Sequence, residues 1–201
     1  MIKLEQIEKP AKTRNLGNSS ETERLKFDFV QLGVEYYVCG RFAFLNLHPP
    51  LAGNLMHHAV EMLLKGILIE TYTVDELKDN FHHRLTKLWS ATKQVTQEGA
   101  LANFDGLIMK LGRFERIRYP DRVVNEGATI QLGLRSGDDV NYPVSSSNPA
   151  TSYQLALEDI DRLVKTLFKL TNYNPKVCLM KLRSDASSVL AHQNLHPFYE
   201  T

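Results

Sequence analysis

Cysteine is scarce in this chain of 201 residues, which contains only Cys39 and Cys178. Both lie in apolar runs, so we expect buried thiols rather than a disulfide scaffold. An excess of one charge is missing as well. The chain carries 24 Lys and Arg residues against 23 Asp and Glu residues, a formal net charge of +1. This balance excludes a broadly basic coat for nucleic acids but leaves room for a local basic patch.

Long hydrophobic runs are also missing. The most apolar stretch, 63–69, is short and contains Lys65, so it cannot cross a bilayer. The first residues have mixed charge and no apolar signal region, and the last residues form no lipidation signal. We therefore expect a cytoplasmic protein without membrane contact. Glycine-rich phosphate loops and the serine elbow of hydrolases do not occur either.

Apolar residues are nevertheless common enough, at 43%, to form a core. They recur at a helical spacing of three and four in several segments. We expect helices over 21–47, 51–72, 81–95, 100–117, 151–171 and 175–193. Pro49 and Pro50 would end the first of these, and Pro175 suits the first turn of the last. The sequence predicts an all-α protein, an up-and-down antiparallel bundle of four to six helices.

The remaining segments define the domain organisation. We expect residues 1–20 to form a polar N-terminal arm, and 21–201 to form a single bundle domain with an insertion at 118–150. Apolar and polar residues alternate from Thr129 to Leu134, and a turn-forming stretch precedes Val140. This pattern favours a small hairpin within the insertion.

Four of the seven histidines occur as two pairs, at 57–58 and 82–83. On a helix, His57 and His58 are each within reach of Glu61, which is an arrangement that can ligate a metal. The alternative is a polar stripe in which Glu61 pairs with Lys65 one turn later. Because metal sites normally have a fuller ligand set, we expect no metal and no cofactor.

Arginines cluster near the predicted end of the helix over 100–117. The cluster contains Arg113, Arg116, Arg118 and Arg122, with aromatic residues between them. Arginine beside aromatic rings can bind phosphate and stack on bases. Cations at a helix C-terminus also complement the helix dipole without any ligand, and we favour this simpler interpretation.

Four segments in this order and spacing resemble the HEPN domain family, over roughly 22–170. They are YYVCGR at 36–41, HHAVEMLLKGIL at 57–68, HRLTKL at 83–88 and RYPD at 118–121. The resemblance implies a helical bundle that forms a homodimer and binds a nucleotide or RNA. It also implies a nucleotidyltransferase-type protein partner in a toxin–antitoxin or defence system.

Many members of this family are ribonucleases with an Arg-x(4–6)-His motif. At the corresponding place, residues 116–125 begin with Arg116 but contain no histidine. We therefore expect a non-catalytic module that binds a nucleotide, RNA or protein partner. The expected ligand contacts are His58, Glu61, Lys65, His83, Arg84, Arg116, Arg118 and Tyr119.

Two alternatives remain open. In the first, the protein is a metal-independent ribonuclease in which Arg41 stabilises the developing phosphorane charge and His48 is the general base. In the second, it is a structural subunit whose bundle face binds another chain.

Overall fold

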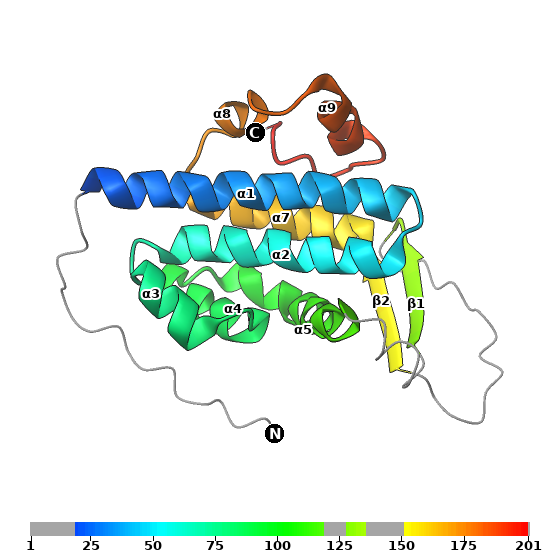
Figure 1. The fold of residues 1–201 in the computed structure, drawn as a ribbon, viewed down its shortest axis with the longest axis horizontal. Coiled ribbons are helices and arrows are strands. Elements are labelled where there is room, and N and C mark those ends of the chain that lie inside the picture. Colours follow the sequence, from blue (N-terminus) through cyan, green and yellow to red (C-terminus); the bar gives the residue numbers. More distant parts are fainter. Residues whose placement is uncertain (1–18, 119–127, 136–150, 201) are drawn as a thin grey trace.

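The computed structural model of the chain describes residues 19–118, 128–135 and 151–200. Figure 1 shows mainly helices with one small sheet, which confirms the all-α prediction. The helices are α1 (Ser19–Leu45), α2 (Pro49–Leu68), α3 (Val74–Glu76), α4 (Leu85–Thr96), α5 (Asp105–Phe114), α7 (Leu157–Thr171), α8 (Pro175–Leu179) and α9 (Ser184–Ala191). The strands are β1 (Ala128–Gly133) and β2 (Thr151–Ala156). Among these elements, no helix is both long and apolar enough to cross a membrane.

A three-residue turn joins α1 to α2. Helix α1 ends at Leu45, the backbone of Leu47 turns through a positive φ of 57°, and Pro49 and Pro50 open α2. Proline suits this position because the first helical N–H groups have no intrahelical acceptor. The predicted break between the first two helices is therefore confirmed.

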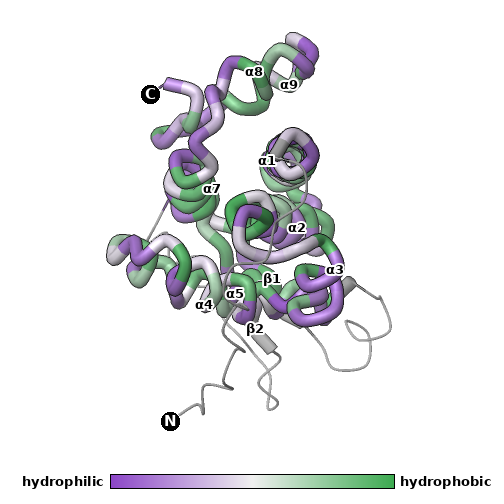
Figure 2. The backbone as a smooth tube through the Cα atoms, turned by 90° about the vertical axis from the view of Figure 1, so that its left-hand side faces the viewer, coloured by the Kyte–Doolittle hydropathy of each residue, from purple (hydrophilic) through white to green (hydrophobic). Residues whose placement is uncertain are grey.

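Helix α2 is the central element of the bundle. It contacts α1, α4, α5 and α7, and Figure 2 shows these helices around it. Apolar side chains such as Leu63 and Leu64 are completely buried. One interpretation of the sequence was a polar stripe on this helix, but the structure buries His57, Glu61 and Lys65 as well. Helices α4 and α5 cover this polar stripe.

The chain between α2 and α5 is more broken than its apolar spacing predicted. A π-helical turn (Leu77–Phe81) follows α3, and His82 takes a positive φ of 48° before α4 begins at Leu85. The predicted helix over 100–117 is three pieces, because 3-10 turns (Gly99–Phe104 and Glu115–Arg118) flank α5. These short turns let Leu101, Phe104 and Ile117 all reach the core.

The small sheet corrects the expected start of the helix over 151–171. Residues Thr151–Ala156 form β2, which pairs in parallel with β1, and α7 begins only at Leu157. Burial alternates here with a period of two residues, as expected for a strand. Tyr153 and Leu155 are buried, while Gln154 between them is exposed. Strand β1 is where the first arm of the predicted hairpin was expected. The second arm, at 140–142, lies outside the described residues, as do 1–18 of the polar arm.

The predicted helix over 175–193 is instead two helices, α8 and α9, separated by an exposed bend at 180–183. Both pack on α1, where Cys178 and Leu190 are buried. On one straight helix these two side chains would point roughly 120° apart, given 3.6 residues per turn. The bend allows both side chains to be buried.

Candidate functional site

Glu61 is the centre of a cluster of polar side chains on α2. Its side chain is fully buried, and Lys65 Nζ donates to Oε1 at 2.7 Å. His58 Nδ1 lies 3.2 Å from Oε2. His83 Nδ1 lies 3.0 Å from Oε1 and 3.2 Å from Oε2. A single buried carboxylate therefore has three nitrogen partners.

Local geometry explains part of this cluster. Residues three and four apart on a helix lie on one face, which brings His58 and Lys65 to Glu61. His83 arrives from outside α2, after the π-helical turn and the left-handed residue His82. A positive φ is costly for a residue with a side chain, so the surrounding fold must hold this turn. The turn places His83 against Glu61.

His57 lies at the buried end of the same cluster. Its Nδ1 lies 3.2 Å from the backbone oxygen of Leu111 on α5, which can only accept a hydrogen bond. Nδ1 therefore carries the proton. Nε2 has no hydrogen-bond partner among the described residues and lies 3.9 Å from Glu61 Oε2.

The surroundings fix the charges in the cluster. Burial alone would raise the pKa of Glu61, but hydrogen bonds from His58, Lys65 and His83 lower it to about 2. Burial lowers the pKa of His57, and its contact with Leu111 opposes this shift only in part. At neutral pH, Glu61 is an anion and His57 is neutral. The ligating atoms of His57, His58 and Glu61 lie within 4.8 Å of one another, so these three could hold a metal ion.

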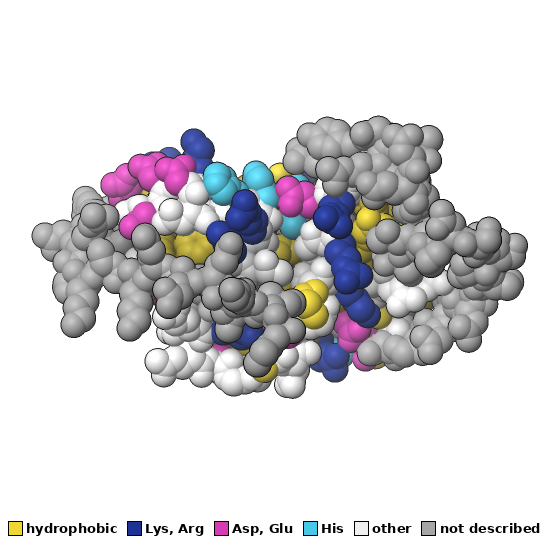
Figure 3. All heavy atoms as spheres, turned by 90° about the horizontal axis from the view of Figure 1, so that it is seen from below, with side chains coloured by type: hydrophobic (Ala, Val, Ile, Leu, Met, Phe, Trp, Pro, Cys, Tyr) yellow, Lys and Arg dark blue, Asp and Glu magenta, His cyan; other side chains and the backbone are white. Residues whose placement is uncertain are grey.

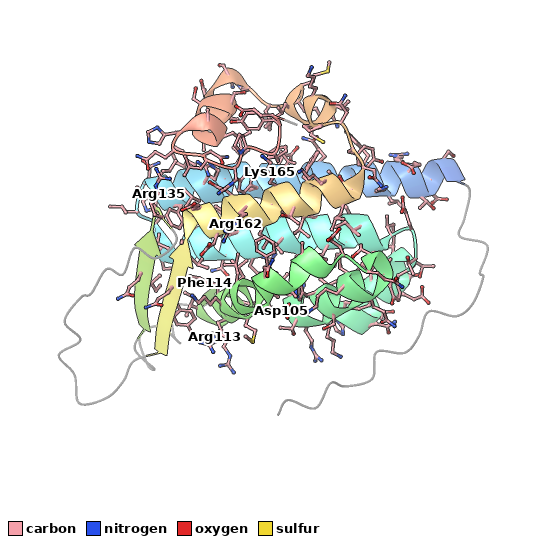
Figure 4. All side chains as sticks on the ribbon, turned by 180° about the vertical axis from the view of Figure 1, so that it is seen from behind. Asp105, Arg113, Phe114, Arg135, Arg162 and Lys165 are labelled. Carbon is pink, nitrogen blue, oxygen red and sulfur yellow. The ribbon has the colours of Figure 1, made fainter. Side chains whose placement is uncertain are left out.

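A shallow groove of about 340 Å³ lies beside this cluster, between the start of α4 and the end of α5. Its lining residues are His83, Arg84, Leu85, Thr86, Met109, Gly112, Arg113 and Glu115. Figure 3 shows histidine side chains next to Lys and Arg side chains on this lower side of the molecule. In Figure 4, the Arg113 side chain points away from the bundle. The groove is therefore mainly cationic, with Glu115 as its acidic member.

Two further features of the groove favour an anion. No side chain caps the start of α4 at Arg84, and the first turn of a helix presents backbone N–H groups without intrahelical acceptors. Within the described ranges, Arg84 and Arg113 form no ion pair. Both side chains are exposed. The arrangement can bind a phosphate or carboxylate group.

The structure brings together most of the residues that the sequence singled out. His58, Glu61, Lys65 and His83 are in direct contact, and Arg84 follows in the groove. Arg116 does not line the groove and lies exposed in the 3-10 turn after α5. The Arg118 side chain and Tyr119 lie outside the described residues.

Arg41 and His48, the candidate ribonuclease pair, do not form a site in this structure. Arg41 is completely buried, where its guanidinium pairs with Asp161 and donates to the backbone oxygens of Val189 and His192. His48 is exposed in the turn before α2. Because the Arg41 guanidinium is not exposed to solvent, this structure offers no surface on which Arg41 could contact an RNA phosphate.

The sequence names two residues of the site without locating them in it. The spacing of His57 to Glu61 is visible in the sequence, but the burial of His57 depends on Leu111 of α5, 54 residues later in the chain. Arg113 was seen only as part of a basic helix end, and its position opposite Arg84 depends on how α4 packs against α5. Comparison with known proteins adds no further residue, because no family model, curated protein or solved structure matches this chain.

Proposed function

We propose that the protein is a HEPN-like, non-catalytic module that binds the phosphate group of a nucleotide or RNA in the groove between α4 and α5. The observation that carries this proposal is the pair of exposed arginines, Arg84 and Arg113, which face one groove without a carboxylate partner in the described chain. Arginine forks match phosphate oxygens in geometry and charge.

Three properties support an anionic ligand such as a phosphate. The uncapped start of α4 adds backbone donors beside the arginines. His83 is held by Glu61 and lines the same groove, so its ring is positioned before a ligand arrives. The whole molecule is nearly neutral, so attraction of an anion must be local. The buried position of Arg41 supports binding without cleavage.

The proposal is tested by titrating the full chain with ATP and with a short RNA, with and without a 5′-phosphate. We expect Arg84→Gln/Arg113→Gln to weaken binding by at least about tenfold, since charge-assisted contacts contribute roughly 1.5–3 kcal/mol each. Arg183→Gln removes an exposed arginine at the start of α9 and should leave affinity unchanged.

The ATP and RNA arms identify the source of the phosphate. Equal affinity of the double variant and the parent, or no measurable binding of either probe by the parent, contradicts the proposed function. Binding that depends on the arginines but not on a phosphate would point to another anion.

We also propose that the protein forms a homodimer through the end of the bundle at the α1–α2 turn. Phe42, Leu47 and Leu51 are 54%, 76% and 52% exposed there, and apolar side chains grouped on a surface favour a protein contact. Light scattering should give twice the mass of one chain. A Leu47→Asp/Leu51→Asp variant should give one chain mass, and an unchanged mass for the variant argues against this face.

A further inference from the structure

We propose that His57, His58 and Glu61 bind a divalent transition-metal ion of the Zn²⁺ type, with His83 beside the open position of the ion. This site lies next to the phosphate groove but does not rest on the proposed function, because His57, His58 and Glu61 are not part of the groove lining. Two imidazoles and one carboxylate form a donor set that zinc uses in proteins.

The spacing of the donor atoms supports the site. Zinc bonds to nitrogen and oxygen are about 2.0–2.2 Å long, so neighbouring ligands in a tetrahedral shell lie roughly 3.3–3.5 Å apart. Glu61 Oε2 lies 3.2 Å from His58 Nδ1 and 3.9 Å from His57 Nε2. These distances bracket the required value. The third pair, His57 with His58, falls within 4.8 Å and needs a small rotation of a ring.

The strongest argument is the unpaired nitrogen of His57. The backbone oxygen of Leu111 accepts the Nδ1 proton, so Nε2 of the neutral ring holds a lone pair. That lone pair lies in the core and faces a carboxylate oxygen, which is also an acceptor. Two acceptors repel each other unless a cation lies between them. A backbone carbonyl that orients the other ring nitrogen is also typical of histidines that bind metals.

The contacts of Glu61 favour Oε2 as the atom that binds the ion. Lys65 donates to Oε1. Among the described residues, only ring nitrogens of His58 and His83 approach Oε2 closely, each at 3.2 Å, so a metal bond at Oε2 replaces these histidine contacts. A metal bond from His58 Nδ1 requires the proton of that ring to move to Nε2. The His58 side chain is 21% exposed, which gives this proton access to water. His83, with a side chain that is 55% exposed, marks the side from which the ion enters.

The charged and titratable groups that face His57 also permit a different outcome. They are Glu61, His58 and, at longer range, Glu115. Glu61 and Glu115 favour a proton on Nε2 of His57, which would then form an ion pair with Glu61 in place of a metal, whereas His58 opposes that proton. The two outcomes differ in the state of Nε2, which nuclear magnetic resonance of ring nitrogens distinguishes.

The experiment uses the full chain after treatment with a chelator and titrates it with Zn²⁺, Mg²⁺ and Ca²⁺ by calorimetry. We expect one Zn²⁺ per chain, and no heat from Mg²⁺ or Ca²⁺, because those hard cations prefer oxygen ligands. Zn²⁺ should shift the Nε2 resonance of His57 and leave its Nδ1 proton in place.

His57→Gln and Glu61→Gln should each weaken Zn²⁺ binding by more than about tenfold. His192→Gln removes an exposed histidine elsewhere and should bind like the parent. Circular dichroism in chelator checks that each variant is folded, and the Nε2 resonance of the parent remains informative if one is not. Arg84→Gln/Arg113→Gln should keep full Zn²⁺ affinity, which separates this site from the proposed phosphate groove.

Several results overturn the site. They are the absence of stoichiometric Zn²⁺ binding by the parent, unchanged affinity in His57→Gln, and an Nε2 atom that carries a proton at neutral pH. Unchanged affinity in His57→Gln would assign the zinc to surface histidines.

Discussion

Glu61 is a carboxylate without solvent exposure in the middle of the central helix. Burial of a charge costs several kcal/mol unless partners replace the lost water. Lys65, His58 and His83 provide that replacement, and the resulting pKa of about 2 keeps Glu61 ionised under ordinary conditions. If Glu61 loses its charge, Lys65 stays largely buried without a carboxylate partner. The cost of burying the Lys65 charge is then no longer offset.

The depressed pKa of Glu61 predicts a dependence of stability on pH. An unfolded glutamate has a pKa of about 4.3, so the unfolded state binds the proton first as pH falls. The contribution of Glu61, about 3 kcal/mol, is complete above about pH 5 and is lost as pH falls toward 2. In urea denaturation with chelator present, Glu61→Gln should be destabilised at pH 7.

This difference between parent and Glu61→Gln should shrink steadily between pH 5 and pH 3. Asp79→Asn changes an exposed acid before α4 and provides the control, for which we expect a small difference at every pH. A constant difference for Glu61→Gln across this range would mean that the carboxylate is not the source of the stability.

At the scale of elements, the contact between α2 and α5 positions both the buried cluster and the groove. Gly53 on α2 allows Phe114 of α5 to lie directly against the helix backbone. A Cβ atom at Gly53 would lie 1.8 Å from Phe114 Cδ1. Phe114 also packs edge-on against Tyr153 of β2, with ring centroids 5.3 Å apart. One glycine therefore sets the distance between two helices and a strand.

This close approach predicts a contrast between two glycines. Gly53→Ala should lose about 1–3 kcal/mol of unfolding free energy, because the methyl group forces Phe114 out of its position. Gly106→Ala on α5 has no atom within 4 Å of the new Cβ and should be neutral or up to about 1 kcal/mol more stable.

Urea denaturation of the two glycine variants measures the contrast. Phe114→Leu combined with Gly53→Ala should recover part of the loss, since a smaller side chain leaves room for the methyl group. Equal stability of Gly53→Ala and Gly106→Ala would contradict the proposed packing.

At the scale of the whole molecule, Arg41 connects three distant parts of the chain. From α1 it pairs with Asp161 on α7 and donates to the backbone oxygens of Val189 and His192 at the end of the chain. The Tyr37 hydroxyl donates to the other oxygen of Asp161 at 2.5 Å. The three side chains are buried, so the Arg41 guanidinium adds a polar attachment of the end of α9 to the apolar contacts that Cys178 and Leu190 make.

Removal of Arg41 should therefore loosen the C-terminal segment. Arg41→Met leaves Asp161 buried without its cation and should cost about 3–5 kcal/mol, the range for one broken partner of a buried pair. Hydrogen exchange should accelerate in α9 before it does so in α2. Arg41→Met/Asp161→Leu should recover part of the stability, because no charge remains buried.

Arg183→Gln, at the exposed start of α9, tests whether the loss of any arginine from this region has the same effect. We expect parent-like stability and exchange for this variant. If Arg41→Met leaves exchange in α9 unchanged, contacts other than the guanidinium hold the segment.

The predicted fold agrees with the structure where apolar spacing or proline within a segment is enough to specify the element. Apolar spacing placed α1, α2 and most of α7, and the proline pair placed the turn between the first two helices. Prediction was wrong at β2 and over 175–193. There the same apolar residues fit a helix, and only their burial against Phe114 and α1 selects a strand and a bend.

Local patterns in the sequence are enough to predict that the protein is helical, that α1 and α2 form a hairpin, and that His58 and Lys65 can reach Glu61. These features depend on residues within one or two turns of each other. Contacts between distant segments bury His57 with an unpaired nitrogen, bring His83 to Glu61, place Arg84 in the same groove as Arg113, and bury Arg41. Each of these depends on contacts between segments that only packing brings together, because helical periodicity identifies an inward face but not what that face meets.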